Sequence, residues 1–233
     1  MTSTKRKNAL ATYNAKRRFQ KTREPKGEQA SEEGFRFVVQ IHAATTTHFD
    51  FRLEADGVLK SWSVPKGPST DPQDKRLAMP TEDHPLEYRD FEGVIPEGEY
   101  GAGTVIVWDE GTYRPLSHDR DGDPVPLAEA LEKGHASFWL DGSKLRGGYA
   151  LTRFRSGDGS GGGNDREAWL LVKEDDARAG GRGAPDPARA RSAHTGRTLK
   201  RVAEEEGGDE KQRKGKGRKQ PTKGPKGSKG SSS

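Results

Sequence analysis

The chain contains no cysteine, which excludes disulfide bridges, thiolate metal sites and cysteine nucleophiles. It also has no apolar run near the roughly 18 residues that span a bilayer, so we expect no membrane segment. Residues 1–30 include nine basic residues but no apolar stretch, which is unlike an export signal and favours a cytoplasmic location. Hydrophobic residues make up only 29% of the 233, which predicts that either the core is small or much of the chain is unfolded.

The net charge of +5 hides an uneven distribution along the chain. Residues 1–26 hold nine Lys or Arg and one acidic residue, and residues 211–229 hold nine Lys or Arg and no acidic residue. These two segments carry +8 and +9, so the residues between them carry −12. The overall basic balance describes the ends and not the body, and by itself it is weak support for nucleic-acid binding.

Composition divides the chain into three parts. Residues 177–233 lose apolar periodicity and are rich in Gly, Lys and Arg, so they cannot offset an ordering cost of roughly 1 to 2 kcal/mol per residue. We predict a disordered basic tail there. We expect residues 1–33 to form a basic arm that is partly ordered over the active site, because apolar residues such as Tyr13 can anchor it. Residues 34–176 are left as one domain of ordinary size.

Within this domain apolar and polar residues alternate in short runs separated by turn residues. The predicted strands are 35–42, 48–54, 58–64, 76–81, 104–108, 112–115, 137–140, 148–154 and 168–173. Hairpin turns are expected at 55–57 and 109–111, and only 127–133 is expected to be helical. Many strands with so little helix predict an all-β fold, a compact antiparallel β-barrel, with a sandwich as the second choice.

The run 48–54 alternates without exception between polar and apolar side chains. Its apolar members share one face, which we expect to be core. The polar members share the other face, and they are His48, Asp50, Arg52 and Glu54. Successive residues on a face are about 6 to 7 Å apart, close enough to share one ligand. Gln40 and His42 share a face of the preceding strand, and the short connection should bring His42 beside His48.

Two histidines and one aspartate, His42, His48 and Asp50, suit a divalent metal and leave positions open for substrate or water. A guanidinium binds phosphate oxygens well, so Arg52 beside this set favours a phosphoester site. One alternative is a solvated strand face with incidental ion pairs, because a lone His-x-Asp pattern is common. Another is a metal-dependent oxygenase, because two histidines and a carboxylate also hold non-haem iron.

A second polar cluster at 81–88 places His84 between acidic residues and a proline. Neighbouring carboxylates favour a cationic histidine, which would suit His84 to protonate a leaving oxygen. The alternative is a surface turn capped by an acidic residue. Lys66 and Arg76 are candidate phosphate contacts, although each alone also fits an ordinary surface cation.

Seven stretches of the predicted domain resemble the 3'-phosphoesterase domain family of bacterial DNA ligase D. They are FVVQIH (37–42), HFDFRLE (48–54), LKSWSVPKG (59–67), EDHPL (82–86), DFEG (90–93), IPEGEYGAGT (95–104) and VWD (107–109). Several long motifs in the same order make this resemblance far more specific than His-x-Asp alone.

The resemblance implies a β-barrel enzyme that depends on manganese, with other divalent metals as alternatives, and that processes 3' ends of DNA or RNA-terminated primer strands. Members of the family remove a terminal 3'-ribonucleoside and hydrolyse the resulting 3'-phosphate to a 3'-hydroxyl fit for ligation. By the same analogy we expect a free-standing monomer near the nucleoid, with an end-joining ligase, polymerase or Ku as partners. The rival hypothesis is a non-catalytic module that binds DNA ends for an end-joining system.

The motif match also carries residue roles onto this sequence. The metal ligands would be His42, His48 and Asp50. The residues at the scissile phosphate would be Arg52, His84 and Tyr88. Supporting or substrate-binding positions would be Arg17, Glu24, Gln40, Lys66, Arg76 and Glu82.

The family has an N-terminal arm that folds over the site, and here it reads YNAKRRF (13–19) and TREP (22–25). Arg17 and Glu24 are retained, but Arg18 replaces the usual acidic residue. The loop 43–47 also differs, because the family commonly has an Asp and an extra His there. The metal set is intact, so these departures bear on the ribonucleoside-removing step, which depends on more of the arm than phosphate hydrolysis does.

Overall fold

The structure is a computed structural model that describes residues 9–27, 34–155, 167–180 and 185–216. The strands are β1 (Arg36–Ala43), β2 (Thr47–Ala55), β3 (Val58–Val64), β4 (Lys75–Pro80), β5 (Gly93–Ile95), β6 (Gly103–Pro115), β7 (His135–Gly142), β8 (Arg146–Arg155) and β9 (Ala168–Lys173). The helical elements are α2 (Ala11–Ala15), the 3₁₀ turn η1 (Leu86–Asp90), α3 (Leu127–Glu132) and α4 (Leu199–Lys216). No helix in the described part is long and apolar enough to cross a membrane.

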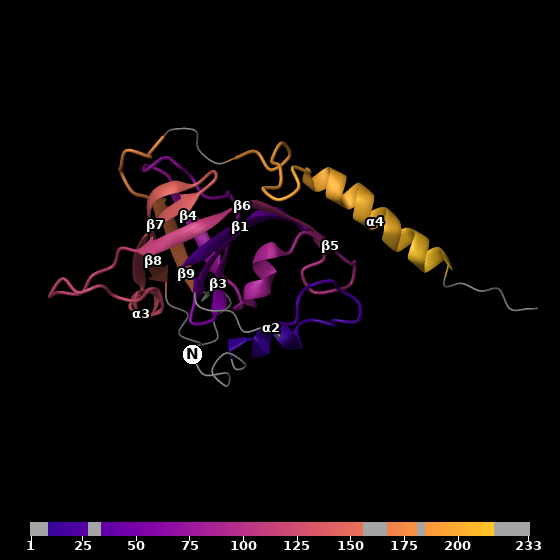
Figure 1. The fold of residues 1–233 in the computed structure, drawn as a ribbon, viewed down its shortest axis with the longest axis horizontal. Helices are drawn as coiled ribbons and strands as arrows, with labels where there is room; N and C mark the ends of the chain where they lie inside the picture. The colour runs from indigo at the N-terminus through magenta and orange to yellow at the C-terminus, as the bar shows by residue number, and fades with distance from the viewer. Residues whose placement is uncertain (1–8, 28–33, 156–166, 181–184, 217–233) are drawn as a thin grey trace, which may run out of the picture.

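Eight strands close into an antiparallel barrel (Figure 1). Their order around the ring is β1-β2-β3-β4-β9-β8-β7-β6, and pairing of β6 with β1 closes the ring. The short strand β5 pairs with the first residues of β6 as an addition to the ring. Closure leaves the ring without free edges, and it confirms the predicted barrel over the sandwich.

Both faces of β2 are buried. Phe49, Phe51 and Leu53 point into the barrel and pack in one cluster with Phe138 and Tyr149 of the facing strands, as the alternation predicts. A second apolar cluster covers the outer face, and it consists of Leu10, Tyr13, Val58, Leu59, Leu86, Tyr88, Phe91, Ile95 and Val105. The polar face of β2 is therefore enclosed between the barrel wall and an outer layer, and it is not the solvated strand face of the alternative interpretation.

The predicted hairpin at 109–111 is wrong, because β6 runs straight through this segment. Asp109 is fully buried, and its carboxylate accepts backbone hydrogen bonds from Lys144 and Leu145 in the turn after β7, at 2.9 and 2.7 Å. Gly111 lets β7 approach, because a Cβ there would collide with a carbonyl oxygen of that strand. Asp109 therefore stabilises a distant turn, and Gly111 allows two strands to pack closely. A rule based on local sequence alone cannot distinguish these roles from a hairpin turn.

Residues 185–216, which fall within the predicted tail 177–233, have a described structure that includes α4. Helix α4 lies against β5 and β6 and then projects from the barrel (Figure 1). Val202 of α4 is fully buried and belongs to the main core cluster. A few well-placed apolar side chains can anchor a mostly charged segment, which average composition does not reveal. The remaining parts, 181–184 and 217–233, lie outside the described residues.

Polar contacts reinforce this docking. The backbone N–H of Ala193 donates to the carbonyl oxygen of Val107 on β6 at 2.7 Å. The guanidinium of Arg197 contacts Glu92, before β5, and Glu206 on α4, each at 3.2 Å. Arg197 thus joins the helix to the barrel through two carboxylates.

Replacing Val202 by aspartate is expected to undock α4 without unfolding the barrel. A buried carboxylate replaces an apolar contact, which costs about 2 kcal/mol or more of docking free energy. Limited trypsin digestion with mass spectrometry should show faster cleavage within 185–206. Ala203→Asp is the matched control, because Ala203 is exposed on the same helix. Equal cleavage rates in both variants would contradict the docking.

Candidate metal and phosphate site

Pairing of β1 with β2 brings the three predicted metal ligands together. His42 lies directly opposite His48, and Gln40 lies opposite Asp50. The two imidazole centroids are 5.0 Å apart, and one possible ligand atom from each of the three residues lies within 4.8 Å of the others. The expectation that the short connection places His42 beside His48 is confirmed.

A backbone hydrogen bond sets which nitrogen of His48 faces the site. Nδ1 donates to the carbonyl oxygen of Thr46 at 2.9 Å, so Nε2 carries the lone pair of the neutral ring. Nε2 lies 3.6 Å from Oδ1 of Asp50. Histidines that bind metals usually donate their second nitrogen to a carbonyl or carboxylate in this way.

His42 is buried, and one of its ring nitrogens is unpaired among the described residues. Burial lowers its pKa, although the Asp50 carboxylate opposes the shift, so the neutral ring that can bind a metal is favoured. Its Nε2 has no hydrogen-bond partner of normal geometry among the described residues. A buried unpaired nitrogen beside a second histidine and a carboxylate fits a divalent metal held by nitrogen and oxygen ligands. His42, His48 and Asp50 could therefore hold such an ion.

The guanidinium of Arg52 is fixed beside this set. Nε donates to Gln40 at 2.8 Å, Nη1 to the hydroxyl of Ser61 at 2.8 Å, and Nη2 to Oδ2 of Asp50 at 3.0 Å. Nη1 also lies 2.9 Å from Nδ1 of His84. A guanidinium has five N–H groups, so one hydrogen of Nη2 is left for a ligand. Arg52 is a rigid positive charge that is only 2% exposed.

His84 is held between two arginines as a neutral ring. Its Nδ1 lies 2.8 Å from the carbonyl oxygen of Glu82, which can only accept, so Nδ1 carries the proton. Its Nε2 then accepts from Nη2 of Arg17 at 3.3 Å. Burial lowers the pKa of His84, and the charges of Arg52 and Arg17 lower it further, to well below the usual value.

The cationic His84 expected from its acidic neighbours is therefore wrong. Asp83 pairs with Lys60 at 2.6 Å, and Glu82 pairs with two cations of the N-terminal arm at 3.0 and 3.1 Å. Burial would raise the pKa of Glu82, but a bond from its own backbone and bonds from these cations outweigh burial, so its pKa is lowered. Both carboxylates pair with cations, which their positions in the sequence do not reveal.

The N-terminal arm, residues 9–27, forms one wall of the site. Tyr13 is fully buried, its ring meets the ring of His84 edge-on with centroids 5.1 Å apart, and its hydroxyl donates to Pro25 at 2.7 Å. The guanidinium of Arg17 lies 3.6 Å from the centroid of Tyr13, and its Nε donates to Glu24 at 2.8 Å. The arm thus carries Arg17 and Glu24 to the metal set.

These side chains enclose one pocket of about 290 Å³. Nine predicted site residues line it, and they are Arg17, Glu24, His42, His48, Asp50, Arg52, Glu82, His84 and Tyr88. Gln40 lies behind the lining, where its amide donates to the carbonyl oxygens of Tyr88 and Phe91 at 3.0 and 2.9 Å. The buried amide thereby holds both Arg52 and the η1 turn.

Two predicted residues, Lys66 and Arg76, are not in the pocket lining. Arg76 on β4 pairs with Asp74 at 2.5 Å, and Lys66 is exposed after β3. They were proposed from motif and charge, neither of which tells where a side chain points. Their roles stay predictions.

Three residues at or near the site were not predicted from the sequence, and they are Ser61, Lys16 and Tyr100. Ser61 could have been found, because it lies opposite Arg52 once β2 and β3 are paired. Lys16 donates to the hydroxyl of Tyr100 at 3.1 Å across 84 residues of sequence, and no local pattern signals such a contact.

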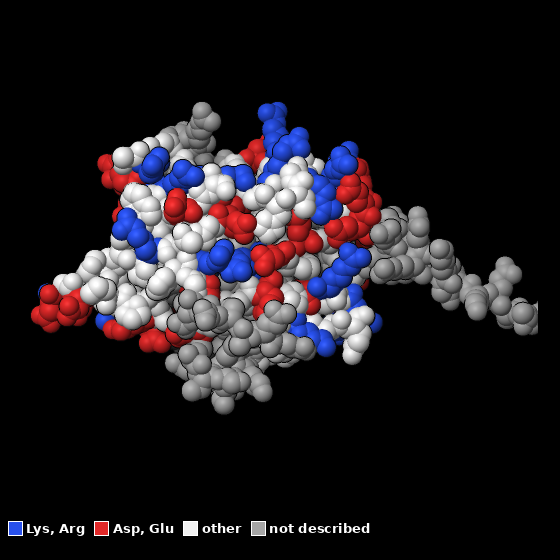
Figure 2. Space-filling view, in the orientation of Figure 1, with Lys and Arg blue, Asp and Glu red and all other residues white. Residues whose placement is uncertain are grey.

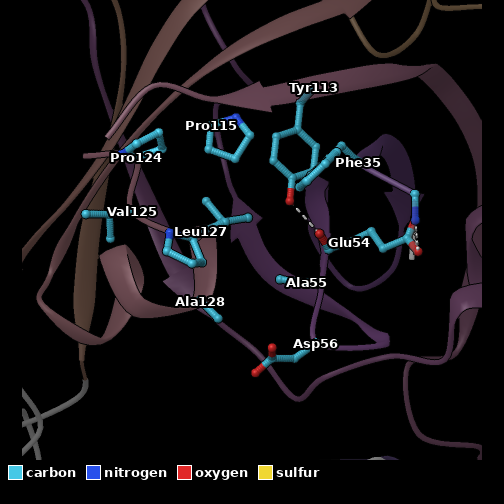
Figure 3. Close-up of a pocket in the computed structure, with 12 residues that line it drawn as sticks. Phe35, Glu54, Ala55, Asp56, Tyr113, Pro115, Pro124, Val125, Leu127 and Ala128 are labelled. Carbon is cyan, nitrogen blue, oxygen red and sulfur yellow. Dashed lines mark hydrogen bonds between the residues drawn. The ribbon is translucent and has the colours of Figure 1, made fainter. Parts of the chain in front are cut away.

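A second pocket, of about 390 Å³, lies at the other ends of β1 and β2 (Figure 3). Its walls are mostly apolar, with Phe35, Val125 and Leu127 among them, and the hydroxyl of Tyr113 donates to the carbonyl oxygen of Glu54 (Figure 3). The residues that line it include no histidine, lysine or arginine. It therefore lacks the cationic side chains that would bind a phosphate.

Comparison with known proteins agrees with this geometry. Residues 40–153 match the model of the DNA Ligase D 3'-phosphoesterase domain. A multifunctional non-homologous end joining protein LigD of Pseudomonas aeruginosa is 50% identical over 173 residues, which are 73% of this chain and 19% of that protein. A LigD of Mycobacterium tuberculosis is 46% identical over 146 residues, 62% of this chain and 18% of that protein.

The chain thus spans about a fifth of the length of these curated relatives. The matched region contains every predicted metal ligand and both Arg52 and His84. The resemblance inferred from the motifs is confirmed. Through its barrel the chain belongs to the DNA ligase D 3'-phosphoesterase domain family.

Proposed function

We propose that this barrel is a metal-dependent phosphoesterase that processes the 3' ends of DNA or RNA-terminated strands during non-homologous end joining. Its products would be 3'-hydroxyl ends, made by removing 3'-phosphates and 3'-terminal ribonucleosides. Manganese is the proposed metal, and an end-joining ligase, polymerase or Ku is the proposed class of protein partner. The monomeric state is part of this proposal.

The observation that carries the proposal is the buried His42, His48 and Asp50 set with Arg52 against it. Nη2 of Arg52 lies 3.0 Å from the same Asp50 oxygen that is 3.9 Å from Nδ1 of His42. A metal and a guanidinium that share one carboxylate would both face a phosphoryl group, which needs positive charge on several oxygens. Arg17 at the same pocket adds a second guanidinium, so phosphate is favoured over the oxygenase alternative.

Each side chain of the site has a separate role in the proposed reaction. When bound, a divalent metal supplies a Lewis acid that polarises a phosphoryl oxygen. Arg52 offers its remaining Nη2 hydrogen to a second phosphoryl oxygen. His84 is neutral and accepts from Arg17, so we assign it to positioning that guanidinium rather than to protonating a leaving group. Glu24 and Glu82 hold Arg17 from the other side.

The non-catalytic alternative needs a surface that binds DNA by charge. On the face that Figure 2 shows, Lys and Arg side chains are interspersed with Asp and Glu and form no continuous basic surface. Binding of DNA ends by charge also does not require a buried set of two histidines, an aspartate and an arginine. Catalysis is therefore the better supported function.

A primer–template carrying a 3'-phosphate should be dephosphorylated in manganese, and removal of the metal with EDTA should abolish turnover. The physical reason is that the two histidines and the carboxylate offer ligands but no Lewis acid of their own. Release of phosphate and the mobility of the labelled primer measure the reaction. A second primer ending in a ribonucleotide tests the ribonucleoside-removing step separately.

The variant His135→Ala should keep this activity, because His135 is exposed on β7 and lies outside the pocket. Binding of DNA ends without turnover in any divalent metal would support the accessory module instead. Oxygen uptake with ferrous iron, and no phosphate release, would support the oxygenase.

A further inference from the structure

The connection between β5 and β6 leaves an aromatic side chain at the mouth of the pocket. Tyr100 lines the pocket, yet 48% of the residue is exposed. The next residue, Gly101, packs against the metal ligand, since a Cβ there would lie 3.8 Å from Cε1 of His42. Tyr100 is thus one residue away from backbone that contacts the proposed metal set.

The arm fixes this ring from one side. Nζ of Lys16 lies 3.1 Å from the hydroxyl of Tyr100 and 4.5 Å from the ring centroid. The same ammonium pairs with Glu82 at 3.1 Å. A cation held on the ring in this way restrains the side chain. The guanidinium of Arg17 lies 5.6 Å from the same ring centroid, and 48% of Tyr100 is still exposed to a flat ligand.

Arg18 fastens the connection that carries the ring. Its Nε and Nη2 contact the two carboxylate oxygens of Glu99, each at 2.8 Å, and Nη2 also donates to the carbonyl oxygen of Gly98 at 2.9 Å. Paired bonds of this kind are the most rigid arginine contacts. The Arg18 that departs from the family pattern therefore joins the arm to the residue next to Tyr100.

We propose that Tyr100 is a stacking platform for a nucleobase adjacent to the phosphate that is cut, with Lys16 and Arg18 as residues that position it. The inference rests on the proposed function, which places the phosphate at Arg52 and the metal set. A base is joined to its phosphate through a single sugar, so a phosphate bound there brings a base to the pocket mouth. Aromatic rings bind bases of any sequence by stacking, which suits an enzyme that must accept any end.

Tyr100→Ala is expected to raise KM for a 3'-phosphorylated primer–template about tenfold, with kcat within about twofold of wild type. Tyr100→Trp, which keeps a stacking ring, should reverse most of that rise. Phe154→Ala is the matched control, because Phe154 is similarly exposed but lies outside the pocket. Manganese titration of the Ala variant should match wild type, which separates lost stacking from a disturbed metal site.

Two further primers identify the stacked base, one abasic at the terminal position and one abasic at the penultimate position. On the primer that lacks the stacked base, Tyr100→Ala should cause no additional rise in KM. An equal effect on all three primers, or an effect on kcat alone, would overturn the stacking proposal while leaving the phosphoesterase intact. Absence of turnover by the wild-type protein on every primer would instead refute the proposed function.

The positioning role of Arg18 has its own test. Arg18→Glu places two carboxylates together and should raise KM on the base-containing primer, and the charge swap Arg18→Glu with Glu99→Arg should restore it. If the swap stays as impaired as the single variant, Arg18 does not act through Glu99.

Discussion

Asp50→Asn is expected to lower manganese-dependent phosphate release by about a hundredfold or more. This is the expected effect of losing one of three protein ligands to a metal. Asp50 is the only acidic member of the metal set, and its carboxylate also faces Arg52 at 3.0 Å. Asparagine keeps the shape and one oxygen acceptor for Arg52, so it disturbs the packing of the barrel least. It removes the negative charge that offsets the guanidinium and would offset a bound cation.

Manganese affinity, measured by calorimetry, and steady-state turnover check this result together. Asp141→Asn is the matched control, because the side chain of Asp141 is 70% exposed on β7 and outside the pocket. The control should retain both properties. If Asp50→Asn binds manganese with unchanged affinity and turns over at the wild-type rate, the metal set has been assigned wrongly.

The paired histidines show what the sequence could predict. Strict alternation in β2 placed His48 and Asp50 on one face, and the short connection to His42 set the register across β1 and β2. Both features are local, and local geometry in a strand has a fixed period. The same reasoning identified the core face correctly, since Phe51 is fully buried inside the barrel.

What covers the other face could not be predicted in this way. The polar face of β2 is buried because the arm, η1 and β5 pack over it, and each of those contacts joins residues far apart in sequence. Tyr13 packs against His84 across the site, and burial together with the charges of Arg52 and Arg17 lowers the pKa of this histidine, although acidic residues flank it in the sequence. The docking of Val202 was likewise hidden, because one buried residue barely changes the average polarity of a charged segment.

Arg52→Met should reduce both stability and activity, and the loss of stability is the clearer signal. The side chain is 2% exposed and donates to Gln40, Ser61 and Asp50. Methionine fills a similar volume but leaves these acceptors without a donor and the carboxylate without its charge partner. Breaking a buried charged pair in this way costs about 3 to 5 kcal/mol of unfolding free energy. Urea denaturation without metal measures that loss apart from catalysis.

Arg52→Lys separates charge from geometry. Lysine keeps the positive charge, but its single ammonium cannot reach three acceptors that a planar guanidinium spans. We expect it to recover part of the stability lost in Arg52→Met while phosphate release stays at least about tenfold below wild type, since the rigid Nη2 donor is gone. Arg114→Met, at an exposed arginine of β6, controls for the loss of a surface charge. Full activity in Arg52→Lys would mean that charge alone matters at this position, and the fixed guanidinium would then be a structural element of the outer layer rather than a phosphate donor.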